Sequence, residues 1–132
     1  MKVILIVGLP GSGKTHLARK LVQNQGLKLF DDIDSLDQLF CALKNQESCI
    51  ITDPNLCDPS IRAKALKILK ENFEELTLEW IFFKNDPESC RKNVAFRNDG
   101  RDVEATIKRF SKVYEVPEGV QSLDIWNSEY AD

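Results

Sequence analysis

The stretch Gly8-Leu9-Pro10-Gly11-Ser12-Gly13-Lys14-Thr15 decides the fold of this chain of 132 residues. It follows an apolar run at residues 3–7 and leads into an amphipathic stretch at residues 16–25. The eight residues fit the pattern G-x-x-x-x-G-K-[ST], in which a strand turns through a glycine-rich loop into a helix. Glycines let the loop point its amide N–H groups inward, and the helix adds its positive N-terminal end. The pattern is therefore typical of a loop that binds phosphate groups.

Two residues of this loop have expected roles on a nucleoside triphosphate. Lys14 would reach the β- and γ-phosphates, and the Thr15 hydroxyl would hold Mg²⁺. The alternative is a glycine-rich turn between a strand and a helix, with an exposed lysine. The flanking strand and helix argue against a chance match to the pattern. We therefore predict that the chain binds a nucleoside triphosphate with Mg²⁺. The nucleotide-binding residues that the pattern predicts are Gly8, Pro10, Gly11, Ser12, Gly13, Lys14 and Thr15.

Length and composition indicate a single globular domain over residues 1–132. A chain of this size buries roughly two thirds of its unfolded surface, so it needs no disulfide or metal to fold. The residues are 42% hydrophobic and 30% charged, and the net charge is −3. This charge argues against a large nucleic-acid footprint, which usually shows as a basic excess, but leaves room for a local basic groove.

The cysteines give no sign of a metal site. There are four, with no C-x-x-C pair, and only one histidine, His16, to which we assign no role. We expect no zinc site, and we interpret the cysteines as reduced side chains of a cytoplasmic protein, with a reactive thiol as the alternative. No signal-peptide pattern and no apolar run of ~20 residues is present, so no membrane contact is expected.

Strand and helix signals alternate along the chain. The predicted strands are residues 3–7, 27–30, 49–52, 76–83 and 122–126, and the predicted helices are residues 15–24, 36–43, 60–72, 86–96 and 102–114. This alternation implies a three-layer α/β fold with a mainly parallel five-stranded sheet and helices on both faces. Trp80 and Trp126 fall in predicted strands and are expected to pack in the core, with stacking on a nucleobase as the alternative. Ligands of such sheets lie beyond the carboxyl ends of the strands.

A group that accepts the proton of an attacking hydroxyl should lie across from the loop. Asp31, Asp32, Asp34 and Asp37 follow the second predicted strand. We choose Asp34 as the general base, with Asp31 and Asp32 as alternatives. The competing interpretation is that Asp34 caps the next helix.

Further charged residues complete the candidate site. Asp53 ends the third predicted strand, where a carboxylate can hold Mg²⁺ directly or through water. An Asx turn before Pro54 is the alternative. Arg97 and Arg101 lie in a polar hinge, within a predicted helical lid at about residues 86–114. An arginine that neutralises transition-state charge accelerates the reaction by a factor on the order of 10³–10⁵. The alternative is that both arginines are ordinary surface charges of a solvated turn between two helices.

With these residues in place, the chain resembles the kinase domain of bacteriophage polynucleotide kinase and its P-loop kinase relatives over about residues 1–117. The resemblance rests on GLPGSGKT at residues 8–15, the acidic segment, ITDPNL at 51–56 and RNDGR at 97–101. It implies a P-loop NTPase fold with strand order 2-3-1-4-5. It also implies that Asp34 is the general base, that Asp53 matches the family's aspartate, and that Arg101 contacts the phosphates.

Two departures concern the acceptor side. The family has an arginine three residues after the general base, where this chain has Asp37. The family also inserts a longer helical segment, whereas only about fourteen residues (35–48) separate Asp34 from Cys49 here. Both departures weaken the case for a nucleic-acid 5′-end as acceptor and leave the donor half intact.

We therefore expect an ATP- and Mg²⁺-dependent kinase that phosphorylates a hydroxyl of a nucleic-acid 5′-end, nucleoside, nucleotide or other small molecule. The alternative is an ATP-binding switch or interaction protein that hydrolyses ATP slowly and has no acceptor. The catalytic candidates are Lys14, Asp34, Arg97 and Arg101, and the candidate Mg²⁺ ligands are Thr15 and Asp53.

Overall fold

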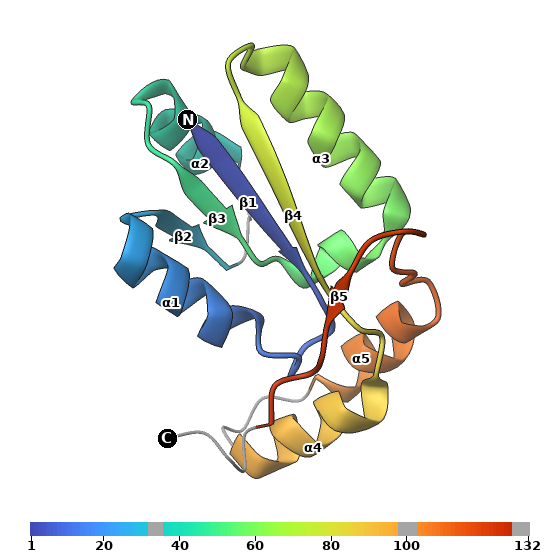
Figure 1. Ribbon diagram of the computed structural model, residues 1–132. Coiled ribbons are helices and arrows are strands. Elements are labelled where there is room, and N and C mark those ends of the chain that lie inside the picture. Colours follow the sequence, from blue (N-terminus) through green and yellow to red (C-terminus); the bar gives the residue numbers. More distant parts are fainter. Residues whose placement is uncertain (32–35, 98–102, 128–132) are drawn as a thin grey trace.

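The computed structural model describes residues 1–31, 36–97 and 103–127 (Figure 1). Its centre is a five-stranded sheet in the order β2-β3-β1-β4-β5, and all four neighbouring pairs are parallel. This confirms the predicted fold class and strand order. The strands are β1 (Lys2–Val7), β2 (Lys28–Phe30), β3 (Cys49–Ile51), β4 (Thr77–Phe83) and β5 (Ser122–Leu123).

The sheet lies between two helical layers because β1 is apolar on both faces. Alternate side chains of a strand point to opposite faces. Ile4 and Ile6 pack against α1 (Lys14–Gln25), and the other set packs against the remaining helices. Those helices are α2 (Leu36–Lys44), α3 (Pro59–Asn72), α4 (Pro87–Arg97) and α5 (Glu104–Ser111), together with the short 3₁₀ helix η1 (Pro54–Cys57).

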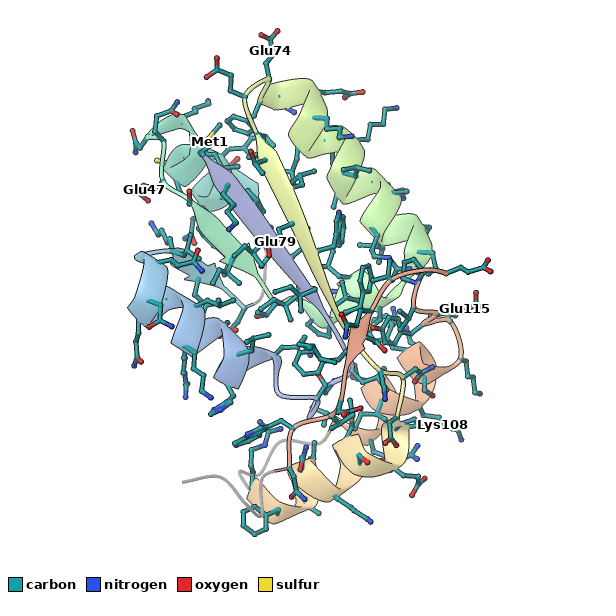
Figure 2. The ribbon with its side chains drawn as sticks, in the orientation of Figure 1. Met1, Glu47, Glu74, Glu79, Lys108 and Glu115 are labelled. Atoms are coloured by element: carbon teal, nitrogen blue, oxygen red, sulfur yellow. The ribbon has the colours of Figure 1, made fainter. Side chains whose placement is uncertain are left out.

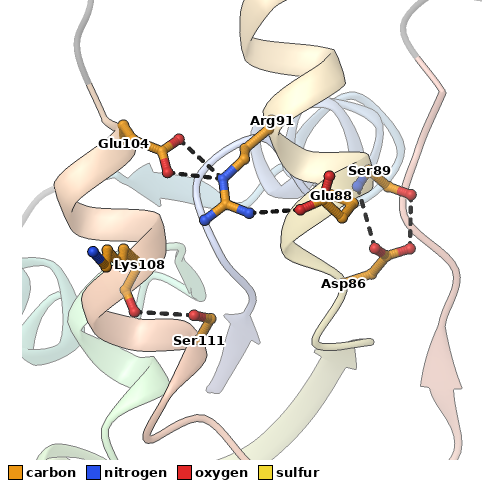
Figure 3. Close-up of polar contacts among 7 residues, drawn as sticks. All are labelled: Asp86, Glu88, Ser89, Arg91, Glu104, Lys108 and Ser111. Carbon is orange, nitrogen blue, oxygen red and sulfur yellow. Dashed lines mark hydrogen bonds and ion pairs between the residues drawn. The ribbon is translucent and has the colours of Figure 1, made fainter.

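Local sequence signals set where two helices begin. The Asp58 carboxylate accepts hydrogen bonds from the Ser60 amide and hydroxyl at 2.9 and 2.8 Å, and Pro59 opens α3. The carboxylate of Asp86, the residue before α4, accepts hydrogen bonds from the Ser89 amide and hydroxyl at 3.2 and 2.7 Å (Figure 3). Both starts match the expectation that proline suits the first helical position behind a capping side chain.

The helices α4 and α5 are tied to each other by charged side chains (Figure 3). Arg91 Nε donates to both carboxylate oxygens of Glu104 at 2.8 and 3.0 Å, and its Nη1 donates to Glu88 at 2.8 Å. At the other end of α5, the Ser111 hydroxyl donates to the carbonyl of Lys108 at 3.0 Å. The region that the sequence predicts to be a lid thus contains two helices linked by an ion pair, while Arg101 lies outside the described residues.

The final strand is shorter than the predicted strand at residues 122–126. The chain leaves the sheet after Leu123, and the Trp126 amide donates to the carbonyl of Ser12 at 3.0 Å. The expectation that Trp126 packs in the core is therefore wrong. Trp80 does pack in the core layer, where its ring stacks on Phe82 with centroids 5.9 Å apart.

The outer surface is charged. Glu47, Glu74 and Glu115 are exposed and point away from the sheet (Figure 2). Among the helices of the described ranges, none has the length and apolar character that crossing a membrane requires.

Candidate functional site

A polar cleft of about 710 Å³ lies at the carboxyl ends of β1, β2 and β3. Its walls come from the glycine-rich loop, the first turns of α1, the helices α4 and α5, and the segment after β5. Figure 1 shows α4 beyond these strand ends, with the segment after β5 running down towards it. Of the predicted site residues, the structure brings together in the lining Pro10, Gly11, Gly13, Lys14, Thr15 and Arg97.

The other predicted residues lie elsewhere. Gly8 and Ser12 belong to the loop but do not line the cleft, and Asp53 lines a neighbouring cavity. Asp34, its alternative Asp32 and the lid residue Arg101 lie outside the described residues.

Two glycines of the loop have a conformation and a close contact that side chains would not permit. Gly11 and Gly13 have φ values of 87° and 107°. A Cβ on Gly11 would lie 2.5 Å from the carbonyl oxygen of Cys90, and a Cβ on Gly13 would lie 2.6 Å from the Cβ of Trp126. The backbone is thus packed tightly against α4 and the segment after β5, and the loop shape is fixed by its surroundings.

The loop also offers unsatisfied donors to an anion. The helix α1 begins behind Gly13, which has no side chain to cap the first-turn amides. Such amides attract phosphate oxygens. The Ser12 hydroxyl is fully buried and has no hydrogen-bond partner among the described residues, which is costly for a polar group. These observations fit a loop built for a triphosphate.

Lys14 is folded back onto the loop. Its Nζ donates to the carbonyl oxygens of Gly8 and Leu9 at 2.8 and 3.0 Å, and the residue is 8% exposed. Burial lowers the pKa of the Lys14 ammonium to about 8. Burial also raises the pKa of the Cys57 and Cys90 thiols to about 11 and 12, so these neighbours stay uncharged near pH 8. A buried, positively charged side chain thus lines the cleft beside the glycine-rich loop.

The lowered pKa of Lys14 predicts that phosphate binding is coupled to proton uptake. Without ligand, Lys14 loses its proton from about pH 8 upward, whereas phosphate oxygens would restore its charge and its ordinary pKa of 10.5. Affinity for tripolyphosphate should therefore fall as the pH rises above 8. Burial of the charged Lys14 also lowers the free energy of unfolding. This loss of stability is fully present below pH 8 and diminishes as the pH rises towards 10.5.

Isothermal titration calorimetry at about pH 9, in buffers of different ionisation enthalpy, measures this uptake directly. Lys14→Met removes the titrating group, so any affinity it retains should show no uptake. Equal heats in the two buffers for the unmodified protein would contradict the prediction.

An acidic side chain does line the cleft, but it is not Asp53. The Thr52 hydroxyl donates to Asp31 Oδ1 at 2.7 Å, and both residues line the cleft. The Asp53 carboxylate instead accepts from the Asn55 amide N–H and side chain, both at 2.9 Å, as in the Asx turn that was the alternative. The hydroxyl of Thr15 and the carboxylate of Asp31 suit Mg²⁺, which takes few protein oxygens and is otherwise held by phosphates and water.

A second cavity of about 310 Å³ adjoins the cleft. The segment 52–54 separates the two, because Thr52 and Pro54 line the cleft while Asp53 lines the cavity. The apolar walls of the cavity come from the sheet, α2 and α3, and Asp53, Asn55 and Lys64 add polar groups. The apolar lining residues are Leu5, Leu39, Phe40, Ile51, Leu56, Ile61, Ala65, Ile68 and Leu69.

Asn93, Trp126 and His16 are among the residues of the cleft lining that sequence reasoning missed. Asn93 Nδ2 donates to the carbonyl of Gly11 at 2.8 Å and also to the carbonyl of Trp126. The Trp126 ring stacks on His16, to which the sequence assigned no role. These contacts join segments far apart in the chain, so no local pattern signals them.

Comparisons with known proteins agree with this architecture. No family model matches the chain. An uncharacterized protein of Acanthamoeba polyphaga mimivirus is 32% identical over 120 residues, and the match covers 87% of each chain. A gluconokinase from Sinorhizobium meliloti 1021 has a similar fold, with a TM-score of 0.63 and 15% identity over 94% of this chain and 82% of its own.

A fungal RNA kinase also has a similar fold. Its TM-score is 0.62 and its identity 15%, over 86% of this chain and 65% of its own. The sheet order and the helical layers match the P-loop kinase fold of both solved structures. The chain therefore belongs to the family of the mimivirus protein and has a P-loop kinase fold.

Proposed function

We propose that this protein is an ATP- and Mg²⁺-dependent kinase that transfers the γ-phosphoryl group to a hydroxyl acceptor. The observation that carries the proposal is the pairing of two cavities: a polar cleft with the buried Lys14, and an apolar cavity across residues 52–54. A donor and an acceptor need such adjacent sites. The similarity in fold to a gluconokinase and an RNA kinase also supports a kinase function.

On the donor side, Lys14 and the amides of residues 8–15 hold the phosphates of ATP. Thr15 and Asp31 line the cleft and would hold Mg²⁺, and Asp53, which lines the second cavity instead, would act through water. When bound, Mg²⁺ neutralises charge that develops on the phosphate oxygens. Arg97 lines the cleft and adds positive charge from α4, and Arg101 belongs to the proposed lid at residues 86–114.

On the acceptor side, we assign the cavity beside Asp53 to the body of the acceptor. The acceptor oxygen forms a bond to the γ-phosphorus as the bond to the β–γ bridging oxygen breaks and ADP leaves. Asp34 takes the hydroxyl proton. The apolar walls favour an acceptor with an apolar or planar body, and the polar groups of Asn55 and Lys64 orient it.

A second candidate function is an ATP-binding switch that hydrolyses ATP slowly. The short acceptor segment at residues 35–48, together with Asp37 in place of the family's arginine, favours it. In that case water reaches the γ-phosphate and the second cavity serves another purpose.

Transfer of labelled phosphate separates the two functions. The protein is incubated with Mg²⁺, ATP labelled at the γ-phosphate, and single acceptors: gluconate, RNA with a 5′-hydroxyl end, nucleosides and nucleotides. The first two follow from the two solved structures with this fold. We expect a labelled product other than inorganic phosphate with one acceptor class. Labelled inorganic phosphate alone, at a rate that no acceptor changes, would support the switch instead.

A further inference from the structure

The wall of the cleft carries an aromatic pair that the proposed chemistry does not use. The rings of His16 and Trp126 are stacked, with centroids 4.2 Å apart and an interplanar angle of 20°. Both residues line the cleft together with Lys14. Trp126 is half-buried and belongs to neither core cluster. A large aromatic side chain that lies outside the core and faces a cleft is placed to contact a ligand.

The backbone of Trp126 is linked to the glycine-rich loop by one direct hydrogen bond and by one bridge through Asn93, and its Cβ packs beside the loop. Its carbonyl accepts from Asn93, which also donates to the carbonyl of Gly11 at 2.8 Å. Its amide donates to the carbonyl of Ser12 at 3.0 Å. Its Cβ occupies the space beside Gly13, where an added Cβ would lie 2.6 Å away. The ring is therefore held in a fixed relation to the loop before any ligand enters, which reduces the entropic cost of binding.

The pair stands where the part of the ligand beyond the phosphates would lie. His16 directly follows Thr15 on the first turn of α1, and Arg19, Val103 and Thr106 line the same cleft. Among the described lining residues, His16 and Trp126 supply the only aromatic rings. Every nucleobase has a flat π-face, and stacking on an aromatic side chain is a general way to hold it.

We propose that Trp126, supported by His16, is the surface on which the nucleobase stacks, and that this pair makes the cleft select a nucleoside triphosphate over an inorganic polyphosphate. The inference rests on the proposed binding of ATP at the loop. Because stacking tolerates any base, the pair sets affinity for a nucleoside and discriminates weakly between adenine and guanine.

The test compares ATP with tripolyphosphate, which has the phosphates but no base. Trp126→Ala keeps the backbone bonds and the Cβ beside Gly13. We expect it to weaken ATP affinity about tenfold, measured by calorimetry, and to change tripolyphosphate affinity by less than about twofold. Trp126→Phe, which keeps a ring, should recover most of the loss. Equal weakening for both ligands, or no weakening for either, would overturn the inference.

Asn93→Ala is the matched control for a purely structural role. It removes the tie between the loop and Trp126, so it should weaken ATP and tripolyphosphate alike. In a Trp80→Phe background, Trp126 is the one remaining tryptophan, and its fluorescence should change with ATP and not with tripolyphosphate. If the unmodified protein binds neither ligand, the proposed nucleotide site fails as well. If it binds both with equal affinity, only the stacking role fails.

Discussion

Replacing Lys14 with methionine should lower the rate of phosphoryl transfer by about 10³-fold or more. Lys14 is 8% exposed, and its ammonium lies against two carbonyl oxygens of the loop. In the proposed reaction it leaves these carbonyls for the β- and γ-phosphates, where charge accumulates in the transition state. Methionine is similar in length to lysine but has no charge. The buried space therefore stays filled, while the electrostatic stabilisation is lost.

Lys20→Met is the matched control, because Lys20 lies on the same helix but is exposed and is not among the lining residues of the cleft. We expect its rate to equal that of the unmodified protein. Thermal unfolding without nucleotide shows whether either variant is folded. A folded Lys14→Met protein that transfers phosphate at the normal rate would contradict the assignment of the cleft to the triphosphate.

The shape of the glycine-rich loop could be predicted because its geometry is encoded locally. Gly11 and Gly13 adopt the positive φ values that glycine favours, and the pattern itself places Lys14 at the start of a helix. The alternation of strands and helices was equally local, and only the strand order had to come from a family resemblance. Element ends differ by a few residues because capping and pairing decide them.

Which strand-end residue faces the cleft could not be predicted from the sequence. Asp53 carries the carboxylate that the sequence favoured as a Mg²⁺ ligand, yet Thr52 lines the cleft and Asp53 lines the neighbouring cavity. The reason is the register between strands: Phe30 pairs with Ile51, so the next residues, Asp31 and Thr52, meet and form a hydrogen bond. Register depends on pairing across the sheet, which no single segment reveals. The stacking of Trp126 on His16 was hidden because it joins the segment after β5 to α1, two segments far apart in the chain.

Asp34→Asn should lower phosphoryl transfer by about 10²-fold or more while ATP affinity stays unchanged, since a general base contacts the acceptor and not the donor. Asp34 lies outside the described residues, and the proposal rests on its position in the acidic segment and on the family resemblance. Asp31 is the competing residue, because the structure places its carboxylate in the cleft.

A magnesium titration separates these two aspartates. If Asp31 helps to hold Mg²⁺, Asp31→Asn raises the Mg²⁺ concentration needed for half-maximal rate, and excess Mg²⁺ restores most of the rate. No Mg²⁺ concentration should restore Asp34→Asn, because a missing proton acceptor is not replaced by a cation. The reverse pattern, with Asp31→Asn inactive at every Mg²⁺ concentration and Asp34→Asn fully active, would make Asp31 the base. Because Asp31 accepts a hydrogen bond from Thr52, the variant Thr52→Val should then share its defect in milder form.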